Sequence, residues 1–180
     1  MQASTKKEVY SWIKSIVFAL VIVFVCRAFI FTPAVVKGQS MEPTFENNDR
    51  VVVSKISEIE RFDVIVFKAA DNVEQYIKRV IGLPGDHVEM RDDVLYINGK
   101  SYEEPYVKRN NKIKLSKVTG DFTLKELTGN EKVPNGYLFV LGDNRLKSKD
   151  SRELGFISAD SVIGEVKFRF YPLQEIGIPK

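Results

Sequence analysis

The chain has 180 residues, of which 44% are hydrophobic and 28% are charged, a composition typical of a globular domain with a small appendage. Its net charge of +3 comes from residues 1–31, because residues 32–180 hold equal numbers of basic and acidic side chains. This balance excludes the basic face that a nucleic-acid duplex requires, so we expect no nucleic-acid partner. A single Cys and a single His exclude an internal disulfide framework and leave too few ligands for a zinc site built from these residues. We therefore expect no metal and no other cofactor.

An apolar stretch near the N-terminus is the first strong signal in the sequence. Residues 16–26 read IVFALVIVFVC without a charged side chain, and only three polar residues interrupt the longer run 12–31. About 20 mostly apolar residues in a helix span the hydrocarbon core of a bilayer. We therefore expect residues 1–11 to be a short cytoplasmic N-terminus, 12–31 a transmembrane helix and 32–180 an extracytoplasmic domain.

The flanks of the apolar stretch bear on its orientation and on two alternatives. Lys6, Lys7 and Lys14 lie before the stretch or at its start, and basic residues favour the cytoplasmic side of a single span. A cleaved secretory signal would end in small residues of the A-x-A kind, and the sequence CRAFIF at 26–31 offers no such site. A buried core helix that is apolar all round is unusual in a chain of this size. We expect a retained anchor in the plasma membrane.

The rest of the chain predicts strands and turns. Asn98-Gly99 predicts the tip of a hairpin over 94–102. Residues 107–133 are polar and weakly patterned, so we expect a mobile excursion there. The predicted fold class of the extracytoplasmic domain is therefore mostly β, an antiparallel sheet or a partly closed barrel. Runs of β-branched and aromatic residues of strand length lie at 50–56, 62–67, 75–81, 136–142 and 164–171.

The sequence GQSMEPT at 38–44 directly follows the apolar stretch. A Ser behind Gly-x allows backbone N–H groups to approach a substrate carbonyl, which makes Ser40 a candidate nucleophile. The alternative is that Ser40 caps a short helical turn before Pro43. On this segment alone, the capping role is the simpler interpretation.

Strand alternation places Lys78 and Arg79 on opposite faces of the predicted strand 75–81. One of the two cations therefore points inward or lies at an edge. An edge lysine that discourages aggregation is one explanation. A desolvated amine is the other, because burial lowers the pKa of Lys, and a drop of about two to three units makes it a general base near neutral pH.

The sequence LGDNRLKSKDSR at 141–152 leaves a predicted strand through Gly and holds two Asp, two Arg and two Ser within ten residues. Pairs of Asp and Arg are bidentate and geometrically specific, so they suit a loop that is held rigid beside a site. A hydroxyl such as that of Ser148 can orient a Lys amine.

These three segments, in this order behind an apolar anchor, resemble the bacterial type I signal peptidases in their compact, Gram-positive form. The motifs of that family are G-x-S-M-x-P-T, K-R-V-I-G-x-P-G-D and G-D-N-R-x-x-S-x-D-S-R, which match 38–44, 78–86 and 142–152. The resemblance implies a membrane-anchored serine endopeptidase, with 32–180 as its catalytic domain. Such an enzyme removes N-terminal signal peptides from secreted preproteins by cutting after small residues at positions −3 and −1. The implied partners are these signal peptides and the phospholipid membrane, with the secretion translocon nearby.

The resemblance also implies a role for individual residues. Ser40 matches the nucleophile, Lys78 its general base, and Ser148 the family Ser that hydrogen-bonds the Lys amine. Gly38 stands where some members carry a hydroxyl donor, so the oxyanion would rely on backbone N–H groups, chiefly that of Ser40. The residues expected to support the site are Asp150, Arg152, Asp143, Arg145 and Arg79. The residues expected to form the pocket for small substrate side chains are Val36, Met41, Tyr76 and Ile77.

Two other classes of function compete with this one. A membrane-anchored binding or sensor module needs no reactive Ser, so the paired motifs around Ser40 and Lys78 argue against it. A self-cleaving Ser/Lys protease of the phage-repressor type is soluble and carries a DNA-binding domain. Here the chain has an apolar anchor and an ectodomain without net charge.

Overall fold

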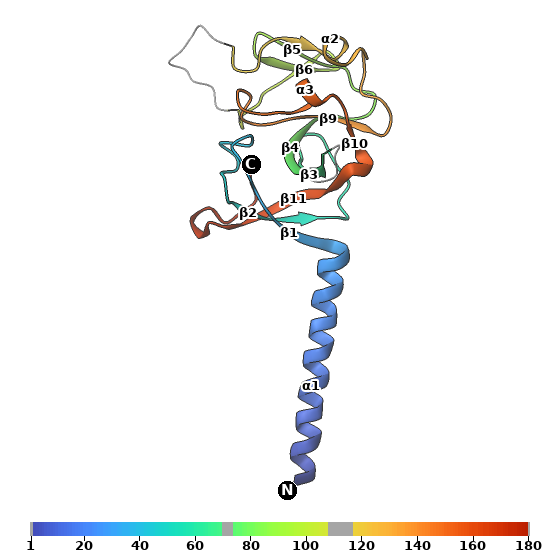
Figure 1. The fold of residues 1–180 in the computed structure, drawn as a ribbon, viewed down its shortest axis with the longest axis vertical. Helices are drawn as coiled ribbons and strands as arrows, with labels where there is room; N and C mark the ends of the chain where they lie inside the picture. Colours follow the sequence, from blue (N-terminus) through green and yellow to red (C-terminus); the bar gives the residue numbers. More distant parts are fainter. Residues whose placement is uncertain (1, 70–73, 108–116, 180) are drawn as a thin grey trace.

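The computed structural model describes residues 2–69, 74–107 and 117–179. One long helix stands below a β-rich domain and joins it at one end (Figure 1). The α-helices are α1 (Gln2–Val25), α2 (Leu124–Thr128) and α3 (Ser151–Leu154). The shorter turns are the π-helical η1 (Cys26–Ile30) and the 3₁₀-helical η2 (Ala159–Ser161) and η3 (Leu173–Glu175).

Seven strands form the larger sheet, in the order β1-β2-β11-β3-β4-β9-β10. Every neighbouring pair in it is antiparallel, which confirms the predicted antiparallel β fold. The strand runs expected from the sequence correspond, to within a few residues, to β2, β3, β4, β9 and β11. The bounds of the seven strands are β1 (Phe31–Val35), β2 (Arg50–Ser54), β3 (Val64–Lys68), β4 (Gln75–Gly82), β9 (Tyr137–Leu141), β10 (Ile157–Ser158) and β11 (Val162–Tyr171).

Four shorter strands form a second antiparallel sheet at the end of the domain farthest from α1 (Figure 1). Their order is β7-β6-β5-β8. Asn98 and Gly99 both have positive φ between β6 and β7, as a two-residue type I′ turn requires, so the predicted hairpin is confirmed. The bounds are β5 (Val88–Arg91), β6 (Val94–Ile97), β7 (Lys100–Tyr102) and β8 (Phe122–Thr123).

Strand β4 contributes to three buried apolar clusters. Ile81 packs in the cluster beneath the smaller sheet, Ile77 in the cluster that includes the turn after β1, and Val80 in the cluster on the other face of β3 and β9. Because both faces of β4 are covered, any side chain from the middle of this strand is taken out of water. This is the setting of Lys78.

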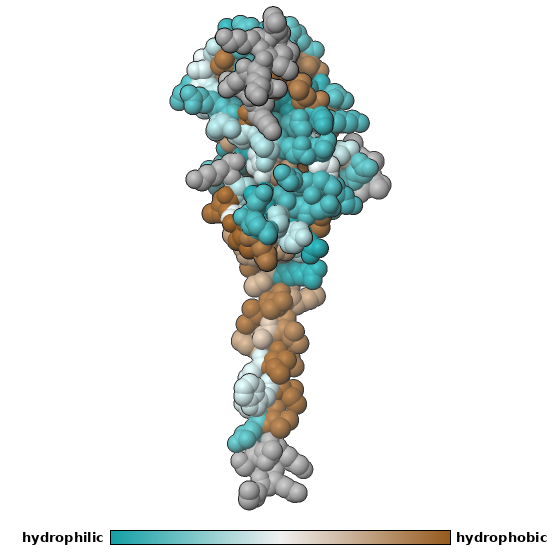
Figure 2. Space-filling model, turned by 90° about the vertical axis from the view of Figure 1, so that its left-hand side faces the viewer, coloured by the Kyte–Doolittle hydropathy of each residue, from teal (hydrophilic) through white to brown (hydrophobic). Residues whose placement is uncertain are grey.

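The helix over the predicted span 12–31 begins earlier than predicted, in α1, and continues through η1 only to residue 30. The segment expected as a separate N-terminus, 1–11, is helical from Gln2 onward, and the helical stem ends at Ile30 because β1 begins at the next residue. The stretch Glu8–Ile30 is long and apolar enough to cross a membrane, and its most apolar window is not buried. Figure 2 shows this stem as a largely apolar column below the polar surface of the domain.

The mobile excursion predicted over 107–133 is wrong for residues 117–133. That part contains β8 and α2, and Thr123 and Glu126 form a capping box in which each side chain accepts a hydrogen bond from the other's backbone N–H. The apolar side chains that it buries in the core are Phe122, Leu124 and Val133. The rest of the predicted excursion, 108–116, lies outside the described residues.

Candidate active site

Ser40 lies in a turn between β1 and β2 that is tied to the rest of the domain. The Gly38 N–H donates to Asn47 Oδ1 at 2.9 Å, and the Asn144 N–H donates to the Ser40 carbonyl at 3.0 Å. Gly38 has a φ of +81°, a conformation that glycine adopts without strain. Within the described residues the Ser40 hydroxyl makes no capping bond and instead accepts a hydrogen bond from Lys78.

The Lys78 side chain reaches this turn from β4. Its Nζ donates to Ser40 Oγ at 2.8 Å and to the Ile77 carbonyl at 2.9 Å, and only 2% of the residue is exposed. On one side β3 pairs with β4 along its first half, whereas on the other side β9 pairs only from Arg79 onward. In the part of the chain that the structure describes, the edge of β4 over 75–78 is therefore open beside the amine.

Burial changes the acid–base properties of this amine. Desolvation lowers the pKa of Lys78 to about 8, although the negative charges of Asp150 and Asp143 oppose the change. An amine with such a pKa is neutral in about a tenth of the molecules at pH 7, compared with fewer than about one in a thousand at the ordinary pKa of Lys. It can then accept the proton of the hydroxyl to which it is bonded.

Asp150 fixes the loop that follows β9. The Gly142 N–H donates to Asp150 Oδ2 at 3.0 Å, and the Arg152 guanidinium donates to both carboxylate oxygens at 2.9 Å. Burial alone would raise the pKa of Asp150, but the hydrogen bonds and charge of Arg152, together with the Gly142 N–H, outweigh burial and lower the pKa. Asp150 is therefore a permanent negative charge near Lys78.

Ser148 lies in this loop, but it does not make the predicted hydrogen bond to the amine. Its Oγ is buried and has no partner of ordinary hydrogen-bond geometry among the described residues, although it lies close enough to Asp150 to favour the charged carboxylate. The Lys78 amine is hydrogen-bonded to Ser40 Oγ and the Ile77 carbonyl instead. The hydrogen bond expected between Ser148 and Lys78 is therefore absent from this structure.

Arg79 and Asp143 form a buried, bidentate ion pair. Arg79 Nε and Nη2 donate to the two Asp143 oxygens at 2.9 and 2.7 Å, and Arg79 Nη1 donates to the Phe62 carbonyl at 2.8 Å. The Thr44 hydroxyl also donates to Asp143. These bonds join β4, the loop after β9 and the turn of Ser40 into one unit.

Arg145 is paired with Glu104, which the sequence analysis did not identify as a site residue. Its guanidinium donates twice to the Glu104 carboxylate, once at 3.1 Å, and the Tyr106 hydroxyl donates to the same carboxylate at 3.0 Å. The Arg145 and Glu104 side chains are 0% and 1% exposed. The sequence EEPY at 103–106 has the composition of a surface turn, so nothing in it distinguishes Glu104 from its neighbour.

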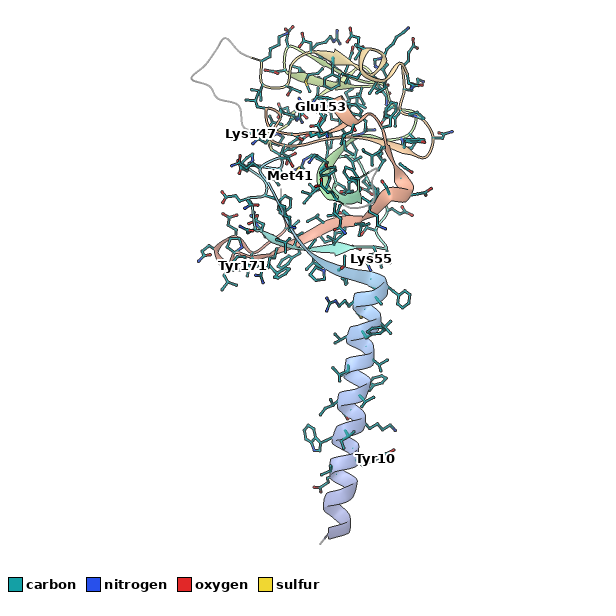
Figure 3. All side chains as sticks on the ribbon, viewed as in Figure 1. Tyr10, Met41, Lys55, Lys147, Glu153 and Tyr171 are labelled. Carbon is teal, nitrogen blue, oxygen red and sulfur yellow. The ribbon has the colours of Figure 1, made fainter. Side chains whose placement is uncertain are left out.

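A cavity of about 410 Å³ opens beside Ser40 and Lys78. Met41 was predicted to line this cavity, and that prediction is wrong. Its side chain is packed in the apolar core below the turn and is only 1% exposed. Figure 3 shows Met41 within the domain. The predicted pocket residues that do line the cavity are Val36, Tyr76 and Ile77. The other lining residues are Ala34, Val35, Lys37, Val51, Val66, Glu74 and Gln75.

The backbone of the nucleophile itself has a donor available for an oxyanion. The Gly38 N–H is bonded to Asn47, whereas the Ser40 N–H donates to no acceptor in the described parts of the chain. A Cβ atom on Gly38 would meet nothing within 4 Å, so this position faces open space. The described residues contain no group of three His, Cys, Asp or Glu side chains that could hold a metal ion.

A serine bonded to a buried amine, beside an open strand edge and a cavity, has the layout of a peptide hydrolase. The family model described as "Signal peptidase, peptidase S26" matches residues 9–171. The chain therefore belongs to the signal peptidase family S26, whose members are serine peptidases.

Individual relatives agree with this assignment. Signal peptidase I of Bacillus caldolyticus is 47% identical over 162 residues, which cover 87% of this chain and 88% of that protein. Signal peptidase IB of Staphylococcus aureus (strain COL) is 47% identical over 179 residues, covering 94% and 93%. A crystal structure of a signal peptidase I from Enterococcus faecalis V583 matches with a TM-score of 0.56 and 48% identity, covering 61% of this chain and 97% of that one. These similarities confirm the predicted family and its mostly β fold.

Proposed function

We propose that this chain removes signal peptides from secretory preproteins through a dyad of Ser40 and Lys78. The observation that carries the proposal is the 2.8 Å contact between Lys78 Nζ and Ser40 Oγ, made by an amine whose pKa burial lowers to about 8. The names of the relatives, signal peptidase I and IB, support the substrate class.

In the first half of the reaction, the neutral Lys78 amine takes the proton of Ser40 as Oγ attacks the carbonyl carbon of the scissile bond. The carbonyl oxygen becomes an oxyanion that accepts a hydrogen bond from the Ser40 N–H. When the C–N bond breaks, the Lys78 ammonium gives its proton to the leaving amine of the mature protein. The signal peptide remains as an ester on Ser40.

In the second half, water attacks the ester carbonyl and Lys78 again takes a proton, this time from the water. The ester C–O bond breaks, and the Lys78 ammonium returns a proton to Ser40. The signal peptide leaves with a new carboxyl group. The enzyme then has the same atoms and charges as at the start.

The open edge of β4 over 75–78 suits an extended substrate. A peptide added to this edge would hydrogen-bond to the backbone and direct alternate side chains to the same face. Residues at −3 and −1 share one face, so a single cavity of about 410 Å³ lined by Val36, Tyr76 and Ile77 suits both. We therefore assign this cavity to the small side chains before the cut.

We also propose that α1 anchors the chain in the plasma membrane, with the β domain on the extracytoplasmic face and close to the translocon. Lys55 Nζ donates to the Ala28 carbonyl at 2.9 Å, which fixes the end of the helical stem against β2. Lys55 and Tyr171 lie at the end of the domain nearest the stem (Figure 3). Exposed apolar side chains of β1, β11 and the segment after β11, which suit a lipid surface, are Phe31, Val35, Tyr171, Leu173, Ile176 and Ile178.

The direct test is to incubate the full-length protein in detergent with a preprotein and to read the new N-terminus by mass spectrometry. The parent should cut after a small residue. Ser40→Ala should not cut, because it lacks the attacking oxygen, while its fold should persist because the change is small and lies in a turn. Cleavage by Ser40→Ala at the parent's rate would exclude Ser40 as the nucleophile.

A further inference from the structure

A cluster of buried charges lies between the smaller sheet and the active site. Each cation in it is paired with a carboxylate at hydrogen-bond distance. The cations are Arg79, Arg145 and Arg152, and the anions are Asp143, Asp150 and Glu104. The cluster is therefore electrically balanced when the Lys78 amine is neutral, the form in which that amine accepts a proton.

Glu104 is the member of this cluster that comes from outside the catalytic motifs. It follows β7 of the smaller sheet and binds Arg145 through both guanidinium Nη atoms. Tyr106, which donates to the Glu104 carboxylate, also contacts the second arginine, because Arg79 Cζ lies 4.0 Å from the centre of its ring. The segment after β7 therefore contacts two of the three arginines.

Arg145 in turn connects the two ends of the loop 142–152. Its Nε donates to the Gly142 carbonyl at 3.0 Å, and its own carbonyl accepts a hydrogen bond of 2.8 Å from Arg152. Arg152 is the residue that binds Asp150. Displacement of Arg145 would therefore disturb the position of the Asp150 carboxylate.

We propose that Glu104 is a positioning residue for the Lys78 amine and acts through Arg145. Glu104 neutralises the charge of Arg145. By holding the Arg145 side chain, it also keeps the loop 142–152, and with it the Asp150 carboxylate, in position near the amine. This inference rests on the proposed function, because it requires Lys78 to be the base. Loss of the Glu104 charge would leave one buried positive charge in excess, and loss of the Arg145 charge would leave one negative charge in excess.

Other charged and polar groups lie around Lys78. Lys37 and Glu74 line the same cavity and are unchanged in the variants used below. Asp143 and Asp150, from the loop after β9, favour the ammonium form. The Ser40 hydroxyl comes from the turn after β1, and the Tyr76 ring of β4 lies 5.5 Å from Nζ. Ordinary Ser and Tyr side chains keep their protons at neutral pH. A change in the pH dependence of the amine therefore reports the charge balance of the cluster.

The experiment measures kcat and KM for a preprotein against pH, with full-length Glu104→Gln, Arg145→Met and the double variant. The apparent pKa of kcat/KM should fall by about half a unit or more in Glu104→Gln, rise in Arg145→Met and return close to the parent's value in the double variant. In Glu104→Gln kcat should fall by about tenfold, with KM nearly unchanged because Glu104 does not line the substrate cavity. Glu104→Asp, which keeps the charge, should keep the parent's apparent pKa.

Asp86→Asn is the matched control. It breaks another largely buried pair, in which Arg61 Nη1 and Asp86 Oδ2 are 2.7 Å apart, and it should lower stability without moving the apparent pKa. If both single variants keep the parent's apparent pKa and lose only stability, Glu104 is structural and the inference is overturned. If one single variant does not fold, the direction in which the apparent pKa moves in the other variant supports or overturns the inference. If kcat/KM of the parent enzyme did not rise with pH through the titration of the Lys78 amine, the proposed function would be refuted instead.

Discussion

A Cβ atom on Gly142 would lie 2.1 Å from Ser148 Oγ and 2.5 Å from the carbonyl oxygen of Ser40. The backbone at Gly142, where β9 ends, therefore passes between the turn of Ser40 and the loop of Ser148. It lies closer to both than a residue with a side chain could. The need for glycine here comes from this close approach, since Gly142 does not have a positive φ. The same residue donates its N–H to Asp150, so the approach also fixes that carboxylate.

Gly142→Ala should lower kcat for preprotein cleavage by about a hundredfold. The added methyl group displaces either Ser148 or the backbone of Ser40, and a shift of about 1 Å at a catalytic group has an effect of this size. Overpacking of this kind should also lower the free energy of unfolding by about 1–3 kcal/mol. Peptide-bond cleavage and urea unfolding measure the two effects. The double variant Gly142→Ala, Ser148→Gly should recover part of the stability, and a single variant as active as the parent would contradict the role of the close approach.

The pH dependence of cleavage tests Lys78 as the base. Because only the neutral amine accepts the Ser40 proton, kcat/KM should rise with pH through an apparent pKa of about 8 and level off above it. Lys78→Arg is the matched control, since it keeps the positive charge but does not deprotonate in proteins. It should be as inactive as Lys78→Ala. Substantial activity in Lys78→Arg would make the cation at this position a structural group and assign the base to another residue.

The sequence predicted five strands of the larger sheet and the hairpin of β6 and β7, whereas the pairing of Ser40 with Lys78 came only from the family resemblance. Strand alternation and the Asn98-Gly99 turn depend on local chemistry, so they can be predicted without knowledge of the packing. The two interpretations of Lys78, an edge cation or a desolvated amine, could not be separated at that level. Their difference depends on the covering of both faces of β4 by distant segments.

The parts that the sequence did not predict depend on contacts between distant residues. Glu104 and Arg145 are 41 positions apart, and no local pattern records that their side chains meet. Met41 follows the nucleophile directly, yet the turn directs its side chain into the core rather than the cavity. The capping box at Thr123 and Glu126 was a readable local signal for α2, but that helix has only five residues and its apolar periodicity is too short to detect.

The orientation of the anchor can be tested with protease added to intact spheroplasts. Residues 32–180 should be digested, whereas a tag placed before Lys6 should be protected, because basic residues before a single span favour the cytoplasmic side. Immunoblotting of the tag, with and without detergent, measures the protection. Detergent should expose the tag and serves as the control. Digestion of the tag in intact spheroplasts would reverse the proposed topology.

Lys78 should also lower the stability of the protein at neutral pH. The unfolded chain holds this amine at the ordinary pKa of 10.5, and the folded chain at about 8, so the folded state binds fewer protons between these two values and stability rises with pH across them. Below pH 8 both states are protonated, and the buried ammonium costs the folded state about 3 kcal/mol. Lys78→Met removes this cost but also two hydrogen bonds, each worth about 1 kcal/mol.

Urea unfolding of Lys78→Met and the parent at several pH values measures the balance. At pH 6–7 the variant should be more stable than the parent by about 1 kcal/mol. The difference should fall steadily from pH 8 to pH 10.5 and change sign, because the parent's amine is then neutral in both states while its hydrogen bonds remain. Ser40→Ala, which leaves the amine buried, should show the parent's dependence on pH. A difference between Lys78→Met and the parent that is independent of pH would show that the amine is not desolvated in the folded protein.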